Sequence, residues 1–148
     1  MKIRPGEDLS PVHLFHRASQ CADELFEAAT QELDITPRQF LVLANIEMRG
    51  GVSQTTLVER TGIDRSTMAD LVRRLLGKGY MQRRRKRKDA RTYSLKLTAE
   101  GLAILEQVTP IADEVNRSLL ACLSHRDAQQ LVRFLKHMVQ SCAPAQRG

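Results

Sequence analysis

The sequence predicts a mainly α-helical domain that carries one small β-hairpin. Apolar residues recur at spacings of three and four through most of the chain, which is the period of an amphipathic helix. One stretch, residues 91–97, instead alternates apolar and polar side chains as a half-buried strand does. The 148 residues include 42% hydrophobic and 27% charged side chains, which is the balance expected of one folded domain.

The first predicted helix covers about residues 12–33. Two rows of apolar side chains widen its face, one row beginning at Val12 and the other at Leu14. A face this broad has to be covered by the rest of the chain, by a second subunit, or by both. Cys21 falls on the apolar side, so we expect a buried core thiol at this position.

The second predicted helix has several start signals at one place. Thr36 can cap the helix, Pro37 suits its first position, and Gln39 can complete a capping box. Apolar residues then follow at helical spacing until the Gly50-Gly51 pair ends the helix.

Two short helices joined by a glycine-containing turn come next. Ser53 caps the first, over about 54–60, residues 61–63 form the turn, and Asp64 caps the second, over about 65–76. This is the pattern of a helix-turn-helix, although a helical hairpin in an all-α bundle shares it. The outer face of the second helix favours DNA binding, because its side chains suit base edges and phosphates: Arg65, Ser66, Thr67, Asp70, Arg73 and Arg74.

Positive charge is concentrated in one segment. The formal net charge is +6, but residues 73–91 alone hold ten basic residues and one acidic residue, so the remaining chain is mildly acidic. Such asymmetry indicates a polyanionic partner, with nucleic acid favoured over a membrane surface. Aromatic residues make up only 4% of the chain, which argues against stacking of single-stranded bases.

The basic run, Arg83 to Lys88, lies between two predicted strands. One strand begins at Tyr80-Met81, and in the other the row Tyr93, Leu95 and Leu97 faces inward while Ser94 and Lys96 alternate with it. A hairpin directly after a helix-turn-helix is the wing of a winged helix.

Two further helices are predicted after the wing. Thr98 caps a long helix over about 99–123, and Pro110 inside it is expected to kink or split it. Ser124 with Asp127 starts the last helix. We expect its inner side to hold Leu131, Phe134, Leu135, Met138 and Val139.

Two motifs carry a resemblance to a known family. The stretch Asp89-Ala90-Arg91, six residues, then Leu97-Thr98-Ala99-Glu100-Gly101 is similar to the D-x-R, strand, L-T-x-x-G pattern of the MarR (multiple antibiotic resistance regulator) family. The helix start at residues 35–40 also matches that family. The resemblance covers essentially the whole chain. It implies one domain, 1–148, with a winged helix-turn-helix over 36–98 and dimerisation helices over 10–34 and 99–142.

The resemblance also implies a homodimer that binds a pseudo-palindromic operator in double-stranded DNA, by default as a repressor. The broad apolar faces near both termini independently favour a symmetric dimer. For base contacts we expect Arg65, Ser66 and Thr67. We expect Arg73 and Arg74 to meet phosphates or a neighbouring acid, and the helix start at Ser53, Gln54 and Thr55 to meet a phosphate.

The wing is expected in the minor groove. In the family, the arginine that matches Arg91 enters this groove and the aspartate that matches Asp89 orients it. A surface ion pair without that role is the alternative. The other DNA-contacting candidates at the tip are Arg84, Arg85, Lys86, Arg87 and Lys88.

Family members often release DNA on binding a small molecule, and the resemblance suggests an aromatic acid or its acyl-coenzyme A thioester. Candidate ligand contacts are His13, His16, Arg17, Arg38 and Phe40. Such side chains can equally be solvated or make interhelical contacts. A redox response through Cys21 is an alternative, although Pro37 and Phe40 stand where peroxide-sensing relatives have tyrosines.

Other function classes have less support in the sequence. No glycine-rich phosphate loop, GxSxG motif or carboxylate constellation is present, so we expect no enzyme, and the lone His13–His16 pair predicts no metal or other cofactor. An architectural nucleic-acid binder without an effector remains an alternative. The three dispersed cysteines, the polar N-terminus and the lack of a membrane-length apolar stretch predict a cytoplasmic protein.

Overall fold

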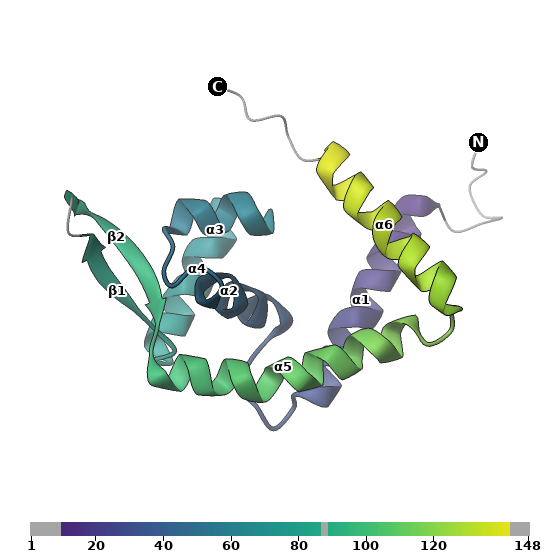
Figure 1. Ribbon diagram of the computed structural model, residues 1–148, viewed down its shortest axis with the longest axis horizontal. Coiled ribbons are helices and arrows are strands. Elements are labelled where there is room, and N and C mark those ends of the chain that lie inside the picture. The colour runs from purple at the N-terminus through teal and green to yellow at the C-terminus, as the bar shows by residue number, and fades with distance from the viewer. Residues whose placement is uncertain (1–9, 87–88, 143–148) are drawn as a thin grey trace.

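The computed structural model describes residues 10–86 and 89–142 of the chain (Figure 1). Six helices and one two-stranded sheet make up this part, which confirms the predicted fold class. In chain order the elements are α1 (Pro11–Ala29), α2 (Pro37–Glu47), α3 (Gln54–Thr61), α4 (Arg65–Gly77), β1 (Met81–Lys86), β2 (Asp89–Leu97), α5 (Ala99–Leu120) and α6 (His125–Cys142).

The predicted capping residues set the starts of five helices. In each case a side-chain oxygen accepts a hydrogen bond from the backbone N–H three residues later, which satisfies a donor that the helix itself leaves free. For α2 the bond is reciprocal, because Gln39 Oε1 accepts from the backbone N–H of Thr36 at 3.2 Å. The five capping residues are Thr36, Ser53, Asp64, Thr98 and Ser124.

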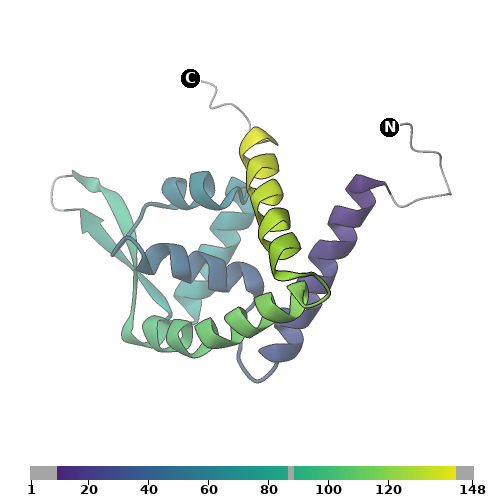
Figure 2. The same cartoon turned by 45° about the vertical axis from the view of Figure 1, so that its right-hand side comes forward.

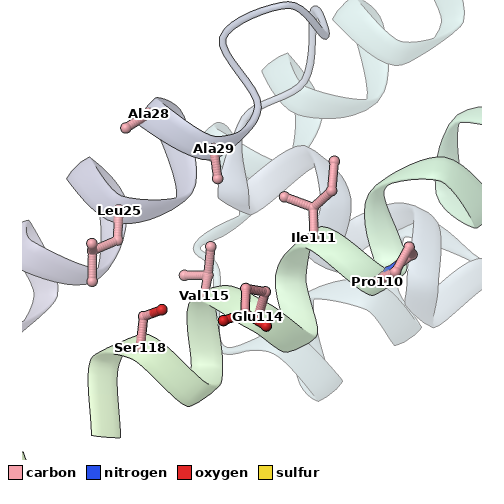
Figure 3. A pocket seen from close by; sticks show the side chains of 8 residues that line it. All are labelled: Leu25, Ala28, Ala29, Pro110, Ile111, Glu114, Val115 and Ser118. Atoms are coloured by element: carbon pink, nitrogen blue, oxygen red, sulfur yellow. The ribbon is translucent and has the colours of Figure 1, made fainter. Parts of the chain in front are cut away.

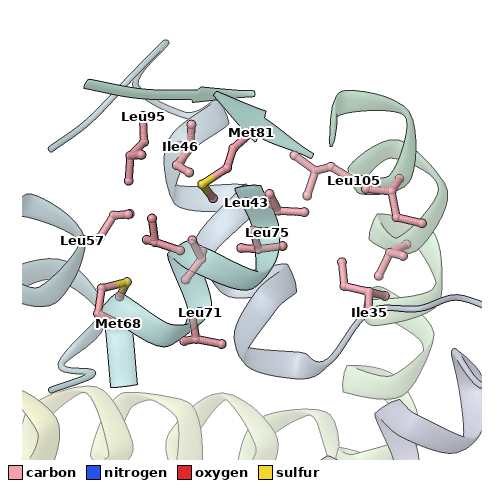
Figure 4. Close-up of a cluster of buried hydrophobic side chains, with 14 of the residues drawn as sticks. Ile35, Leu43, Ile46, Leu57, Met68, Leu71, Leu75, Met81, Leu95 and Leu105 are labelled. Atoms are coloured by element: carbon pink, nitrogen blue, oxygen red, sulfur yellow. The ribbon is translucent and has the colours of Figure 1, made fainter. Parts of the chain in front are cut away.

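One hydrophobic core holds α2, α3, α4 and the hairpin together (Figure 4). Its centre is a set of fully buried side chains: Leu43, Ile46, Leu57, Met68 and Leu75. A short bridge between Val52 and Leu95 adds a third extended segment beside the hairpin, with bonds of 3.0 and 2.7 Å. This bridge ties the base of the hairpin to the loop before α3, so the hairpin and the helices form one unit.

The hairpin projects from this core as an antiparallel pair with Met81 opposite Leu97 and Arg85 opposite Tyr93. Leu95 is buried as predicted, but Tyr93 is 45% exposed and Ser94 is buried. The alternating pattern predicts that Ser94 is exposed, and this prediction is wrong. Its hydroxyl reaches the backbone carbonyl of Arg84 at 3.4 Å, so a polar contact accompanies the burial.

Helix α5 packs against this core along much of its length, α1 adds Phe26 to it, and α6 stands beyond it (Figures 1 and 2). Helix α1 ends at Ala29, earlier than predicted, because the Thr30 hydroxyl bonds to the carbonyl of Phe26 and the chain turns toward α2. Helix α5 continues through Pro110 and ends at Leu120, so the expected split is wrong. Pro110 is exposed, and the helix that contains it bows gently in Figure 1.

Two expectations about burial are wrong within the single chain. Cys21 is exposed, because α1 buries only Phe26 among its residues. Helix α6 buries none of its side chains, since it stands beyond the core. The row expected inside is therefore exposed by 36–71%: Leu131, Phe134, Leu135, Met138 and Val139.

Candidate nucleic-acid interface

Helix α4 presents its first turn to solvent. Arg65 and Ser66 are exposed, whereas Thr67 is half-buried. Asp64 fixes this end of the helix, because its Oδ1 accepts from the backbone N–H of Thr67 at 2.9 Å. The hydrogen bonds from Thr67 hold the pKa of Asp64 below its usual value, so the cap is ionised at neutral pH. The two exposed side chains are therefore placed on a fixed helix start.

An ion-pair cluster lies further along the same helix. The Asp70 carboxylate binds Arg73 through Oδ1 and the Nε of Arg74 through Oδ2, the second at 2.7 Å. These bonds, with that from Arg73 first, lower the pKa of Asp70. The Arg73 and Arg74 side chains remain 73% and 60% exposed, so both guanidinium groups stay accessible to a large anion.

Helix α3 presents a less open start. Ser53 is half-buried, and its hydroxyl oxygen accepts from the backbone N–H of Thr56 at 3.1 Å, so it acts as a cap. Gln54 is half-buried and Thr55 is exposed. The helix is held to α2 by Arg60, whose Nε donates to Asn45 Oδ1 at 2.9 Å. This bond adds a polar contact to the core packing between α2 and α3, and no spacing signal in the sequence indicates it.

Strand β1 carries a row of exposed cations. Arg83, Arg84 and Arg85 are all exposed, and the guanidinium of Arg85 lies 5.9 Å from the centre of the Tyr93 ring. For Lys86, Asp89 and Arg91 the structure describes only the backbone, in β1 and β2. Because the side chains of Asp89 and Arg91 are not described, the expectation that Asp89 orients Arg91 stays a prediction. Arg87 and Lys88 lie outside the described residues.

One cation of the basic segment is turned inward. Lys78 Nζ lies 2.8 Å from Asp34 Oδ1 and also donates to the Asp34 carbonyl and to Gln39 Oε1. It therefore joins the end of α4 to the start of α2, rather than adding to the positive surface. Sequence reasoning missed this contact, because the partners lie about forty residues away in the chain.

The turn from α4 to β1 keeps the two basic elements together. Gly79 adopts φ +74°, its N–H bonds to the Leu76 carbonyl, and the N–H of Tyr80 bonds to the Leu75 carbonyl. Thr98 closes the turn by donating its hydroxyl hydrogen to the Gly79 carbonyl at 2.6 Å. The cations of α4 and β1 thus belong to one rigid unit that can contact a polyanion.

Comparison with known proteins identifies the family. The model of the MarR family matches residues 35–93, the region that holds this unit. SarZ, a transcriptional regulator of Staphylococcus haemolyticus, is 31% identical over 108 residues, which cover 73% of this chain and 72% of SarZ. The chain belongs to the MarR family. The transcriptional repressor NicR of Pseudomonas putida is 26% identical over 129 residues, which cover 87% of this chain and 82% of NicR.

Solved structures of MarR-type regulators share the fold. Streptomyces coelicolor PcaV in complex with its natural ligand has a TM-score of 0.83 and 32% identity, covering 95% of this chain and 99% of PcaV. Bordetella bronchiseptica BpsR, whose DNA binding is regulated by 6-hydroxynicotinic acid, has a TM-score of 0.85 and 25% identity, covering 93% and 97%. A mutant of Escherichia coli MarR complexed with operator DNA has a TM-score of 0.80 and 28% identity, covering 86% and 92%. The chain is therefore a transcriptional regulator of the MarR type.

The candidate effector residues are dispersed in this MarR-family chain. His13, His16 and Arg17 are exposed in the first two turns of α1, while Arg38 is exposed at the start of α2. Arg17 lies about twelve residues, or roughly 18 Å along the helix, before the end of α1, where the chain turns toward α2. Phe40 is half-buried and packs against Phe26 with ring centres 5.7 Å apart. Three of these residues therefore lie near the start of α1 and two near the start of α2.

A hollow of about 580 Å³ lies between α1 and α5 (Figure 3). Its walls are mainly apolar, with Leu25 and Ala29 of α1 facing Ile111 and Val115 of α5. None of the candidate effector residues lines it. The hollow adjoins exposed apolar side chains of α1, so it belongs to the part of the surface that lacks a partner in the single chain.

No helix in the described part of the chain is long and apolar enough to cross a membrane.

Proposed function

We propose that the protein is a homodimeric repressor that binds a pseudo-palindromic operator in double-stranded DNA and is released by a small aromatic acid or its coenzyme A thioester. In this proposal residues 36–98 contact DNA, and the helices within 10–34 and 99–142 form the dimer. One observation carries it: the chain has exposed cations on α4 and β1 at one end and unpartnered apolar helix faces at the other.

The exposed side chains of α4 support major-groove binding. Arg65 and Ser66 project from the first turn, where the N-terminal residues of a recognition helix meet base edges. Arg73 and Arg74 lie further along the helix, which suits phosphate contacts. The projecting hairpin then reaches an adjacent minor groove, with Arg91 near its tip. The operator complex of E. coli MarR, a protein of the same fold, supports this assignment.

The exposed faces of α1 and α6 support a homodimer. Val12, Leu14 and Phe15 are 44–67% exposed on α1, and α6 adds a second row of exposed apolar side chains. Exposed apolar side chains on both helices favour burial against a partner. A second copy of this chain presents the same faces, and a twofold axis would bury both sets at once. The same axis would set two recognition helices one turn of DNA apart, about 34 Å.

Repression and release are supported by relatives. NicR is a repressor, and the DNA binding of BpsR is regulated by 6-hydroxynicotinic acid, an aromatic acid. In this chain Arg38 and Phe40 offer a cation and an aromatic surface next to the α1–α2 connection. A ligand that prefers one arrangement of the helices would shift the dimer away from the spacing that DNA requires.

Sedimentation and DNA titration test the proposal together. We expect a dimer in sedimentation equilibrium and tight binding to a duplex of about 30 bp that the protein selects from a random pool. If the dimer neutralises about eight phosphates, the slope of log affinity against log salt should be near −7. A monomer without salt-dependent binding would refute the proposal, whereas equal affinity for selected and random duplexes would favour an architectural role.

Thermal-shift screening tests the effector. Benzoate, hydroxybenzoates, hydroxynicotinates and their coenzyme A thioesters would be compared with and without the selected duplex. A true inducer has to stabilise the free protein more than the complex. The variants Arg38→Ala and His13→Ala then test the candidates on α2 and on α1 separately. Only a variant that removes a contact with the ligand should reduce the thermal shift that the ligand produces.

A further inference from the structure

Asp70 is the single acidic residue of α4, and it lies among the side chains proposed to face DNA. Both of its carboxylate oxygens are engaged, one by Arg73 and the other by Arg74. The Asp70 side chain is itself 42% exposed, so the carboxylate lies at the surface between the two guanidinium groups. A DNA backbone that approaches this part of α4 therefore meets two cations and one anion.

Helix stability alone is a weak reason for this arrangement. Ion pairs between exposed side chains three or four residues apart contribute little to folding, because water screens them and ordering the side chains costs entropy. The effect on an approaching polyanion is larger, since attraction to phosphates depends on every charge the protein brings to the duplex. A carboxylate on this face also restricts base contacts, because among base edges of the major groove it is best matched by the cytosine N4 donor.

We propose that Asp70 is a specificity-determining residue, which holds Arg73 and Arg74 against α4 and so limits binding to DNA of arbitrary sequence. The inference rests on the proposed DNA-binding function. On a selected duplex, the base contacts of the first turn fix the register of the helix, and the two arginines meet phosphates from ordered positions. On other sequences those base contacts are absent, and the Asp70 carboxylate reduces the attraction that would remain.

The decisive variant is Asp70→Asn, which keeps the size of the side chain and removes its charge. Binding is measured by fluorescence anisotropy on a random-sequence duplex of the same length and on the selected duplex, over a series of salt concentrations. We expect affinity for the random duplex to rise roughly 5- to 10-fold at about 100 mM salt, and the salt slope to steepen by up to about 2 per dimer, because each protomer gains one positive charge. Preference for the selected duplex should fall.

Two further variants separate position from net charge. Asp70→Glu keeps a carboxylate within reach of both arginines, so we expect binding close to that of the wild type. Glu106→Gln removes an exposed carboxylate from α5 and changes the net charge equally, away from the proposed interface. The inference requires Asp70→Asn to lower sequence preference more than Glu106→Gln does.

The outcomes are distinguishable. Equal behaviour of Asp70→Asn and Glu106→Gln would overturn the role of Asp70 while leaving salt-dependent operator binding intact. An unchanged preference in Asp70→Asn would do the same. If the wild type binds neither duplex, the proposed function itself fails, and the role of Asp70 fails with it.

Discussion

Gly101 in the first turn of α5 lies against the backbone carbonyl of Tyr80, where α4 gives way to β1. A Cβ atom built on Gly101 would overlap the Tyr80 carbonyl oxygen. The same carbonyl accepts from the backbone N–H of Thr98 at 3.2 Å, and Thr98 caps α5. The Leu-Thr-x-x-Gly motif thus has a physical explanation: Thr98 joins the helix to the turn, and Gly101 leaves room for that contact.

Replacing Gly101 with alanine should therefore destabilise the fold. The methyl group meets backbone rather than a flexible side chain, so we expect the free energy of unfolding to fall by about 2–3 kcal/mol. Urea titration followed by circular dichroism measures the loss. The matched control is Gly77→Ala in α4, where the new Cβ meets no atom within 4 Å and stability should be unchanged or raised by up to about 1 kcal/mol. A wild-type urea midpoint for Gly101→Ala would contradict the explanation.

Lys78 should contribute to stability rather than to DNA binding. Lys78→Met keeps the apolar stem but removes the bonds to Asp34 and to buried Gln39, so we expect a loss of about 1–2 kcal/mol in urea unfolding. Asp34→Asn should cost less than about 0.5 kcal/mol, because the Asp34 side chain is 83% exposed and its backbone carbonyl still accepts. A larger effect of Lys78→Met on DNA affinity than on unfolding would show that the side chain acts at the interface.

The Asp64 cap makes the stability of α4 depend on pH. Hydrogen bonds from Thr67 lower the folded-state pKa of Asp64, so its contribution is complete above the unfolded carboxyl pKa, about 3.9, and is lost as pH falls through the lower folded value. Asp64→Ala should lower the thermal midpoint at neutral pH, and the difference from the wild type should shrink as pH drops below about 4. Asp64→Asn keeps a neutral cap, so its stability should not change through titration of this position. A wild-type-to-alanine difference that stays constant from neutral pH down to strongly acidic pH would contradict the assignment.

Local chemistry explains which parts of the structure could be predicted. The caps at Thr36, Ser53, Asp64 and Thr98 each act within three residues, so the sequence contains all the information that places them. The hairpin follows from alternation and from its charged tip. The pairing of Asp70 with Arg73 and Arg74 was also within reach, since spacings of three and four put these side chains on one face.

Contacts between distant segments were out of reach for the same reason. Neither the Lys78–Asp34 pair nor the Arg60–Asn45 bond has a signal in spacing or composition. The pattern of α1 leaves open whether the same chain or a second subunit covers its broad face, and the expected burial of the α6 row is wrong within the single chain. An apolar stripe shows that a face will be covered but not by which chain. The exposed position of Cys21 has the same origin.

The wing prediction rests on Arg91. Arg91→Ala should weaken binding to the selected duplex by about 10- to 100-fold, because an arginine in a narrow minor groove gains from its negative potential. Anisotropy titration measures the affinity, and sedimentation should still show a folded dimer. Arg126→Ala removes the same charge from exposed α6 and should change affinity by less than about 3-fold. Equal affinities for the two variants would remove the wing from the proposed interface.

The dimer prediction rests on α6, where Phe134 is 55% exposed in the apolar row. Phe134→Glu would place two uncompensated carboxylates in a symmetric interface, so we expect the dimer dissociation constant to rise by about 100-fold or more. Gln129→Glu adds the same side chain on the polar side of the helix and should leave the dimer intact. Sedimentation equilibrium measures both, with circular dichroism as the check on folding. A Phe134→Glu monomer should also lose the avidity of two linked recognition helices on one operator. If Phe134→Glu stays dimeric while Gln129→Glu dissociates, the two copies pair through the opposite side of α6.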